Sequence, residues 1–118
     1  HYELKFRDQK GMDPGLVYKA IAEKQVDVIS GFATDGRIPA FNLVVLEDDK
    51  KFFPPYLAAP VVRMDLLTKA PKVAEILNRL AGKISDDAMA ALNSAVDVKK
   101  QDAETVAKDF LKNQGLVK

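Results

Sequence analysis

The sequence contains no cysteine, and its only histidine is His1. Without cysteine the chain can form no disulfide, thiolate nucleophile or zinc-thiolate site. A single histidine at the terminus argues against a histidine-based catalytic triad and against a metal site built from imidazoles. The six glycines occur singly, so there is no phosphate-cradling loop and no dinucleotide fingerprint. We therefore predict a protein that is not an enzyme, with no catalytic residue, metal or cofactor.

The chain also lacks an excess of charge and a long apolar run. Its 18 basic and 17 acidic residues give a net charge of +1, which does not attract nucleic acid. No run approaches the roughly 20 apolar residues of a membrane span, and no basic-then-apolar leader opens the chain. With 47% hydrophobic and 30% charged residues over 118 positions, the composition is typical of a globular domain. We expect an excised part of a longer protein.

The first 41 residues contain two strand patterns around one helix pattern. Alternating apolar residues predict a strand over 2–7, and apolar residues on both faces predict a buried strand over 26–33. Between them Asp13 is a candidate N-cap, with Pro14 at the first helical position. The apolar stripe of this helix is expected to be Leu16, Val17, Ala20 and Ile21. Strand, helix and strand together indicate a β-α-β unit.

The remaining residues predict two strands followed by three helices. The strands are expected over 43–49 and 58–63, separated by prolines at 54 and 55 that stop regular pairing. Helices are expected after Pro71, Ser85 and Asp102. Gly82 is expected to end the first of them in a left-handed conformation, and Gly115 is expected to end the last. The fold class is therefore α/β, with a mixed sheet flanked by helices.

Two pairs of adjacent carboxylates are the remaining candidates for acid-base chemistry. Asp48 and Asp49 point apart if they lie on a strand, and Asp86 and Asp87 fall in the positive first turn of a helix. We interpret both pairs as solvated surface or capping residues.

Two aromatic residues stand at places that suit a ligand. Phe32 ends the buried strand, at the sheet edge where open α/β folds bind ligands, and Tyr56 follows two prolines that fix the backbone. From spacing alone, core packing remains open for Phe32, and so does a half-buried loop position for Tyr56.

Three segments carry a resemblance to a known family: VDVISGFATDGRI, LVVLEDDKKFFPPYLAAPVVR and LAGKISDDAMAALNSAVD, preceded by MDPGLVYKAIAEKQVDV. In this order they resemble the substrate-binding proteins of glycine betaine, carnitine and choline ABC importers over essentially the whole chain. The resemblance implies a fragment of a two-lobed, periplasmic-binding-protein-like (type II) clamp. Residues 1–41 would end the second lobe and cross over, and residues 42–118 would return to the first lobe.

The same resemblance implies a function and a site. Such proteins bind a quaternary ammonium solute outside the cytoplasmic membrane, in the periplasm or on the outer face of the cell membrane, and deliver it to an ABC permease for osmoprotection. Phe32 and Tyr56 would form part of an aromatic cage around the trimethylammonium group. Thr34, Asp35 and Arg37 are weaker ligand candidates, because this segment also suits a structural connector in which Gly36 has a backbone conformation unfavourable for other residues.

Alternatives remain open. The family often has tyrosine where this chain has Phe32, so a bulkier betaine such as ergothioneine is an alternative solute. Two other classes of function are a structural or oligomerising α/β module without a ligand, and an enzyme that acts on a small betaine or amine. Strands without partners predict self-association, for example as a strand-exchanged homodimer, and any membrane attachment would be an anchor or fused permease outside the chain.

Overall fold

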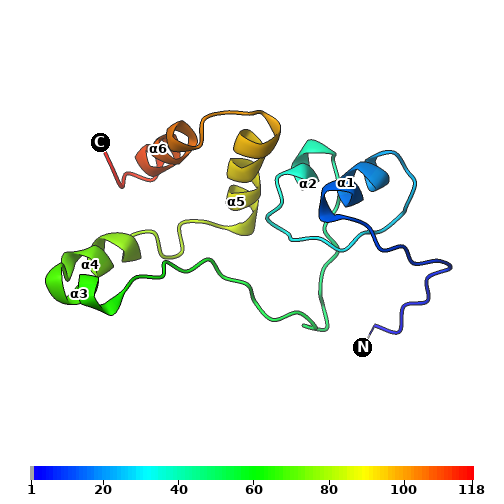
Figure 1. Ribbon diagram of the computed structural model, residues 1–118, viewed down its shortest axis with the longest axis horizontal. Helices are drawn as coiled ribbons and strands as arrows, with labels where there is room; N and C mark the ends of the chain where they lie inside the picture. The colour runs from blue at the N-terminus through cyan, green and yellow to red at the C-terminus, as the bar shows by residue number, and fades with distance from the viewer. Residues whose placement is uncertain (1) are drawn as a thin grey trace.

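Helices joined by long extended segments make up the computed structural model, which describes residues 2–118 (Figure 1). In chain order the elements are α1 (Pro14–Ala22), α2 (Arg37–Ala40), α3 (Met64–Lys69), α4 (Lys72–Asn78), α5 (Asp86–Asn93), the π-helical turn η1 (Ser94–Val98) and α6 (Ala103–Asn113). His1, the only histidine, lies outside the described residues.

The helix ends follow the predicted capping residues. Asp13, Ser85 and Asp102 each accept a hydrogen bond from a backbone amide in the first turn of α1, α5 and α6. Gly82 and Gly115 have φ angles of 69° and 66°, the left-handed conformation expected after a helix. These predictions are confirmed, because capping depends on contacts within a few residues.

The predicted strands are not confirmed. The segments 2–7, 26–33, 43–49 and 58–63 contain no strand within residues 2–118, so the mixed sheet of the expected α/β fold is not formed there. A strand requires a neighbouring strand that exchanges backbone hydrogen bonds with it. The extended backbone fits the strand pattern, but no described segment of this chain pairs with it. The sequence also did not predict α2 or α3, which are short helices of four and six residues.

The chain is more open than a globular domain of its length. Its radius of gyration is 18.2 Å, whereas about 13 to 14 Å is expected for a compact chain of this size. Its accessible surface of 10174 Å² exceeds by roughly 3,800 Å² that of a monomeric globular protein of the same mass. This excess is as large as the area buried in an obligate interface. Val44, Leu46 and Val61, all in the extended segments, are 75% to 95% exposed.

The best-packed region lies where α2 meets α5 and η1, which are neighbours in Figure 1. Gly36, at the start of α2, is buried there, together with Ala90 and Ser94. Tyr18 and Ala20 of α1 are the other buried side chains of the described core. Every helix within residues 2–118 is too short or too polar to cross a bilayer. The segment 34–37, which contains the candidate ligand residues, therefore belongs to the best-packed region among the described residues.

Candidate functional site

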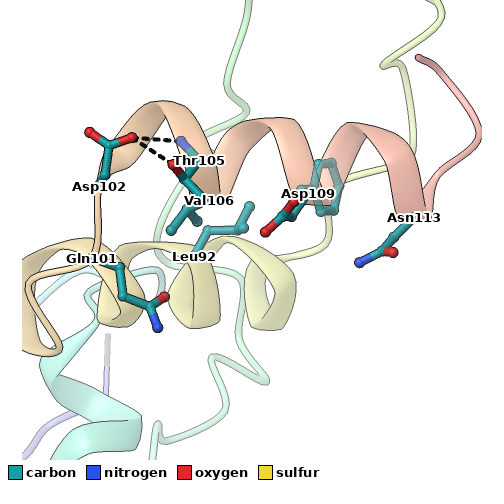
Figure 2. Close-up of a pocket in the computed structure, with 8 residues that line it drawn as sticks. Leu92, Gln101, Asp102, Thr105, Val106, Asp109 and Asn113 are labelled. Carbon is teal, nitrogen blue, oxygen red and sulfur yellow. Dashed lines mark hydrogen bonds between the residues drawn. The ribbon is translucent and has the colours of Figure 1, made fainter. Parts of the chain in front are cut away.

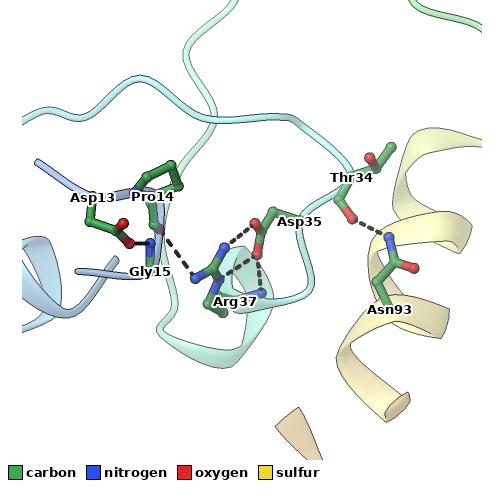
Figure 3. Close-up of polar contacts among 7 residues, drawn as sticks. All are labelled: Asp13, Pro14, Gly15, Thr34, Asp35, Arg37 and Asn93. Carbon is green, nitrogen blue, oxygen red and sulfur yellow. Dashed lines mark hydrogen bonds and ion pairs between the residues drawn. The ribbon is translucent and has the colours of Figure 1, made fainter. Parts of the chain in front are cut away.

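The segment Thr34-Asp35-Gly36-Arg37, called the connector below, is held by a dense set of polar contacts (Figure 3). The Arg37 guanidinium donates to both carboxylate oxygens of Asp35, with Nε–Oδ1 at 2.9 Å and Nη2–Oδ2 at 2.7 Å. The backbone amide of Arg37 donates to Asp35 Oδ1 at 2.9 Å, and its Nη1 donates to the Pro14 carbonyl at 3.5 Å. These contacts are those of a structural connector, the alternative role that the sequence left open for this segment.

The charges of the connector are directed at each other. The hydrogen bonds from Arg37 lower the pKa of the Asp35 carboxyl, and the carboxylate in turn raises the pKa of Arg37. Both side chains are partly buried, with 18% of Asp35 and 33% of Arg37 exposed. A bidentate pair of this kind uses the groups that a ligand would need. A direct role of Asp35 or Arg37 in binding stays a prediction.

Gly36 is required for a different reason from the one predicted. Its φ of −64° and ψ of −16° are ordinary right-handed helical values, so the expectation of an unfavourable backbone conformation is wrong. A Cβ at this position would instead lie 2.3 Å from the backbone nitrogen of Ser94 and 2.6 Å from the carbonyl carbon of Asn93. The Asn93 side-chain amide also donates to the Thr34 carbonyl at 2.8 Å (Figure 3). The connector therefore lies directly against the backbone at the junction of α5 and η1.

Tyr18 is a site neighbour that the sequence interpretation missed. Its side chain is 5% exposed, and the guanidinium carbon of Arg37 lies 4.0 Å from the centre of its ring. Leu16, assigned to the buried stripe of this helix, is 59% exposed instead. The helical spacing did not show that Tyr18 would be buried and Leu16 exposed. The buried face of α1 depends on its contact with the connector, which is distant in sequence. The only sign in the sequence was that Tyr18, an aromatic residue, lies next to the expected apolar stripe and not within it.

A second polar cluster surrounds Asp48. The Tyr2 hydroxyl donates to Asp48 Oδ1, and the backbone amides of Phe52 and Phe53 donate to the same carboxylate at 2.9 and 2.8 Å. The Tyr2 oxygen accepts from the Lys50 amide at 2.9 Å. Asp48 thus caps the turn that follows it, which agrees with the interpretation of this pair as solvated surface or capping residues. The hydrogen bond from Tyr2 and those from the two amides lower the pKa of Asp48.

The Asp48 cluster fixes the backbone that leads to Tyr56. Partial burial, followed by the hydrogen bond to Asp48, raises the pKa of Tyr2 to about 12. Leu4 joins Tyr2, Phe52 and Phe53 in lining a shallow groove of about 330 Å³. Two prolines and then Tyr56 follow this anchored turn within a few residues. The segment 48–53 therefore provides a rigid start for the Phe-Pro-Pro-Tyr sequence.

The two predicted cage residues project from the structure. Phe32 is 73% exposed and Tyr56 is 76% exposed. The backbone of Phe32 is nevertheless fixed, since its carbonyl accepts from the Asp35 amide at 2.9 Å. Among residues 2–118 the structure brings Asp35 and Arg37 together but records no contact between the Phe32 and Tyr56 rings. Both rings are available to a ligand, and whether they share one is a prediction.

A larger groove lies elsewhere, between α5 and α6 (Figure 2). Its volume is about 500 Å³, and its lining includes Leu92, Val106 and Phe110. Asp102, at its rim, has its pKa lowered by hydrogen bonds from Thr105. Neither groove described here is lined by Phe32 or Tyr56. The described residues contain no group of three or more side chains suited to a metal ion.

Comparison with known proteins gives one consistent result. The family described as the substrate binding domain of ABC-type glycine betaine transport systems matches residues 1–113. The carnitine transport binding protein OpuCC of Listeria monocytogenes is 44% identical over 110 residues, which are 93% of this chain and 36% of that protein. The ergothioneine transport permease/ergothioneine binding protein EgtU of Helicobacter pylori strain G27 is 41% identical over 115 residues, 98% of this chain and 21% of that protein.

Solved structures agree with the sequence relatives. The crystal structure of a glycine betaine/carnitine/choline ABC transporter protein superposes with a TM-score of 0.89 at 43% identity. The match covers 98% of this chain and 42% of the solved chain. This chain thus spans well under half the length of the proteins it matches, and its helices and extended segments follow the course of a larger binding-protein structure.

Proposed function

The chain belongs to the family of substrate-binding domains of ABC-type glycine betaine transport systems, and from this premise we propose that the protein carrying it is the extracytoplasmic solute-binding component of an importer. The family is one of transport binding proteins and not of enzymes. The proposed solute is a quaternary ammonium compound such as glycine betaine, choline or carnitine, taken up for osmoprotection. The proposed partner is the permease of the same transporter.

Quaternary ammonium chemistry explains why the site would depend on aromatic rings. A trimethylammonium group has no N–H donor, so a protein recognises it through dispersion and through the negative faces of aromatic rings. Each ring contributes on the order of 0.5 to 2 kcal/mol, and more where water is excluded. Phe32 and Tyr56 have the exposure that such a cage requires, and the backbone of Phe32 is held by the Asp35 amide. The exposure of these two rings within a chain of this family is the observation that carries the proposal.

The proposed assignment of lobes follows the same premise. Residues 1–41 would complete the second lobe and residues 42–118 would belong to the first, with the crossover at the connector and the segment that follows it. Support comes from the position of the connector, where α2 packs on α5 and η1. A ligand between Phe32 and Tyr56 would then touch both sides of the crossover.

Ergothioneine is the alternative solute. Phe32 retains the π face of a tyrosine but lacks its hydroxyl, so a solute that needs no hydrogen bond at this position is favoured. The Helicobacter pylori relative is named for ergothioneine binding. This trimethylammonium betaine would use the same cage, and competition between solutes decides between the two assignments.

Isothermal titration of the full-length protein with glycine betaine, choline, carnitine and ergothioneine tests the proposal. We expect saturable binding of at least one solute, with each of Phe32→Ala and Tyr56→Ala weakening it by about 2-fold to 30-fold. The proposal is wrong if no solute binds, or if both substitutions leave the affinity unchanged.

Conservative variants separate the ring face from simple packing. Phe32→Tyr and Tyr56→Phe keep the aromatic face, so each should retain affinity within a few-fold. Phe32→Leu keeps apolar bulk but removes the face, and should resemble Phe32→Ala. Equal binding by Phe32→Leu and Phe32→Tyr would show that the ring acts only as hydrophobic surface.

A structural role is the second candidate, favoured by the large exposed surface. The excess of roughly 3,800 Å² and the unpaired extended segments would promote association of isolated copies of residues 1–118, for example by strand exchange. Light scattering on this chain alone is expected to show dimers or larger species. A well-folded monomer would contradict this expectation without affecting the solute-binding proposal.

A further inference from the structure

The residue immediately before Phe32 lies against a buried tyrosine from another element. A Cβ on Gly31 would lie 2.5 Å from the Tyr18 hydroxyl oxygen and 3.3 Å from the ring carbon that bears it. The first distance is far inside ordinary contact, so Gly31 is held against Tyr18 with no room for a side chain. The hydroxyl end of the Tyr18 side chain thus packs against the peptide that precedes Phe32.

The Tyr18 side chain is itself held in place. Tyr18 is 5% exposed, and Arg37 lies over its ring at 4.0 Å while pairing with Asp35. A cation above an aromatic face and a bidentate ion pair both restrict side-chain rotation. The backbone amide of Asp35 donates to the Phe32 carbonyl at 2.9 Å and so closes the turn that follows Phe32. The backbone around Phe32 is therefore fixed on its N-terminal side by Tyr18, which lies against Gly31, and on its C-terminal side by the Asp35 amide.

Among the described residues, the Tyr18 hydroxyl is buried without a well-formed hydrogen bond, although the Asp35 carboxylate and the Phe32 backbone lie close enough to shift its pKa. Within residues 2–118 it is a buried oxygen without a hydrogen-bond partner, which is uncommon and costly in native proteins. Burial and then the Asp35 carboxylate raise the pKa of Tyr18, and the Phe32 backbone amide lowers it. The hydroxyl therefore lies near both ends of the turn that presents Phe32, and it leaves no room for a Cβ on Gly31.

From this geometry we infer that Tyr18 is a positioning residue for Phe32, and that Gly31 provides the clearance that sets the position of the ring. The inference rests on the proposed function, since it assigns Tyr18 an effect on solute affinity through Phe32. A cage recognises a cation only when its faces are correctly placed before the ligand arrives. Tyr18 would thus influence which solute fits without touching it.

A double-substitution cycle in the full-length protein tests the inference by isothermal titration with the tightest-binding solute of the panel. Gly31→Ala introduces the clash and should weaken binding by about tenfold or more. Tyr18→Phe alone removes the hydroxyl that lies against Gly31 and should weaken binding by about two- to threefold, because the peptide before Phe32 loses part of its support. Combined with Gly31→Ala, it leaves a tight but tolerable 3.3 Å contact and should restore affinity to within about threefold of the parent.

Gly11→Ala is the matched control, because nothing lies within 4 Å of a Cβ at that position. It should bind as the parent does. If Gly31→Ala does not yield folded protein, the inference requires that addition of Tyr18→Phe recovers both folding and binding. A purely structural role of Gly31 predicts no such recovery by loss of one hydroxyl.

The outcomes separate this inference from the proposed function. If Phe32→Ala binds as the parent does, the proposed function fails and the positioning role fails with it. If Phe32→Ala weakens binding while Gly31→Ala binds normally, or while Gly31→Ala is equally weak with and without Tyr18→Phe, only the positioning role is overturned. Rescue by Tyr18→Phe together with loss in Phe32→Ala supports both.

Discussion

Replacing Gly36 with alanine tests whether the connector is fixed by contact or by backbone conformation. At a φ of −64° and ψ of −16°, alanine is as acceptable as glycine. Reduced freedom of the unfolded chain would then make Gly36→Ala stabilising by about 0.4 to 1 kcal/mol. If backbone conformation were the only factor, the variant would be more stable than the parent.

The contact with α5 and η1 predicts the opposite sign. The new Cβ would lie 2.3 Å from the Ser94 nitrogen, whereas ordinary contact begins at 3.4 Å, so the two backbones must separate. Overpacking of this kind costs about 1 to 3 kcal/mol, and a contact with backbone lies at the upper end, because no side chain can rotate away. After the favourable term is subtracted, we expect a net loss of about 2 kcal/mol in the free energy of unfolding.

Urea denaturation of the full-length protein, followed by circular dichroism, measures this difference. Gly36→Ala should lower the midpoint without changing the slope, and Gly11→Ala should leave the midpoint nearly unchanged, since its Cβ meets open space. A Gly36→Ala midpoint equal to or above that of the parent would refute the reasoning and remove the basis for a tight contact between the connector and α5.

Two pH dependences follow from the polar clusters. The pKa of Asp35 is depressed, so its pairing with Arg37 adds stability at pH values above the unfolded pKa of about 4, and this stability is lost as the pH falls through the folded pKa. Asp35→Asn should therefore make the urea midpoint fall less steeply with decreasing pH. Parallel curves of midpoint against pH for parent and variant would contradict this. The pKa of Tyr2, about 12 against about 10 in the unfolded chain, means that its hydroxyl adds stability below pH 10 that is lost as the pH rises toward 12. Tyrosinate absorbance should show a residue titrating near pH 12 that Tyr2→Phe removes, in addition to Tyr18, whose pKa is also raised; unchanged titration in Tyr2→Phe would refute this.

Local features were predictable from the sequence and non-local ones were not. Asp13, Ser85 and Asp102 were identified as caps because the partner amide lies within three residues. The strands were predicted from the local pattern of apolar residues, which shows that a segment suits a sheet but not which strand would pair with it. The segment 43–49 is therefore extended and exposed instead of paired.

The site divides in the same way. Phe32 and Tyr56 were selected through short motifs, and the ion pair of the connector joins residues two positions apart. Tyr18 and Asn93 were missed because they contact the connector from 19 or more positions away in the chain, and no periodicity marks such a contact. Gly36 was recognised as necessary but for the wrong reason, since a close approach to another helix is not visible in a single sequence.

The central claim is recognition of a quaternary cation by aromatic faces that include Phe32 and Tyr56. Its most direct measurement compares the affinity of the full-length protein for glycine betaine with that for 3,3-dimethylbutanoate, which has the same shape but no positive charge. We predict that the cation binds more tightly by about 5-fold or more, and that the preference falls in Phe32→Ala and Tyr56→Ala. Equal affinity for the two compounds, or a preference that survives both substitutions, would contradict the account.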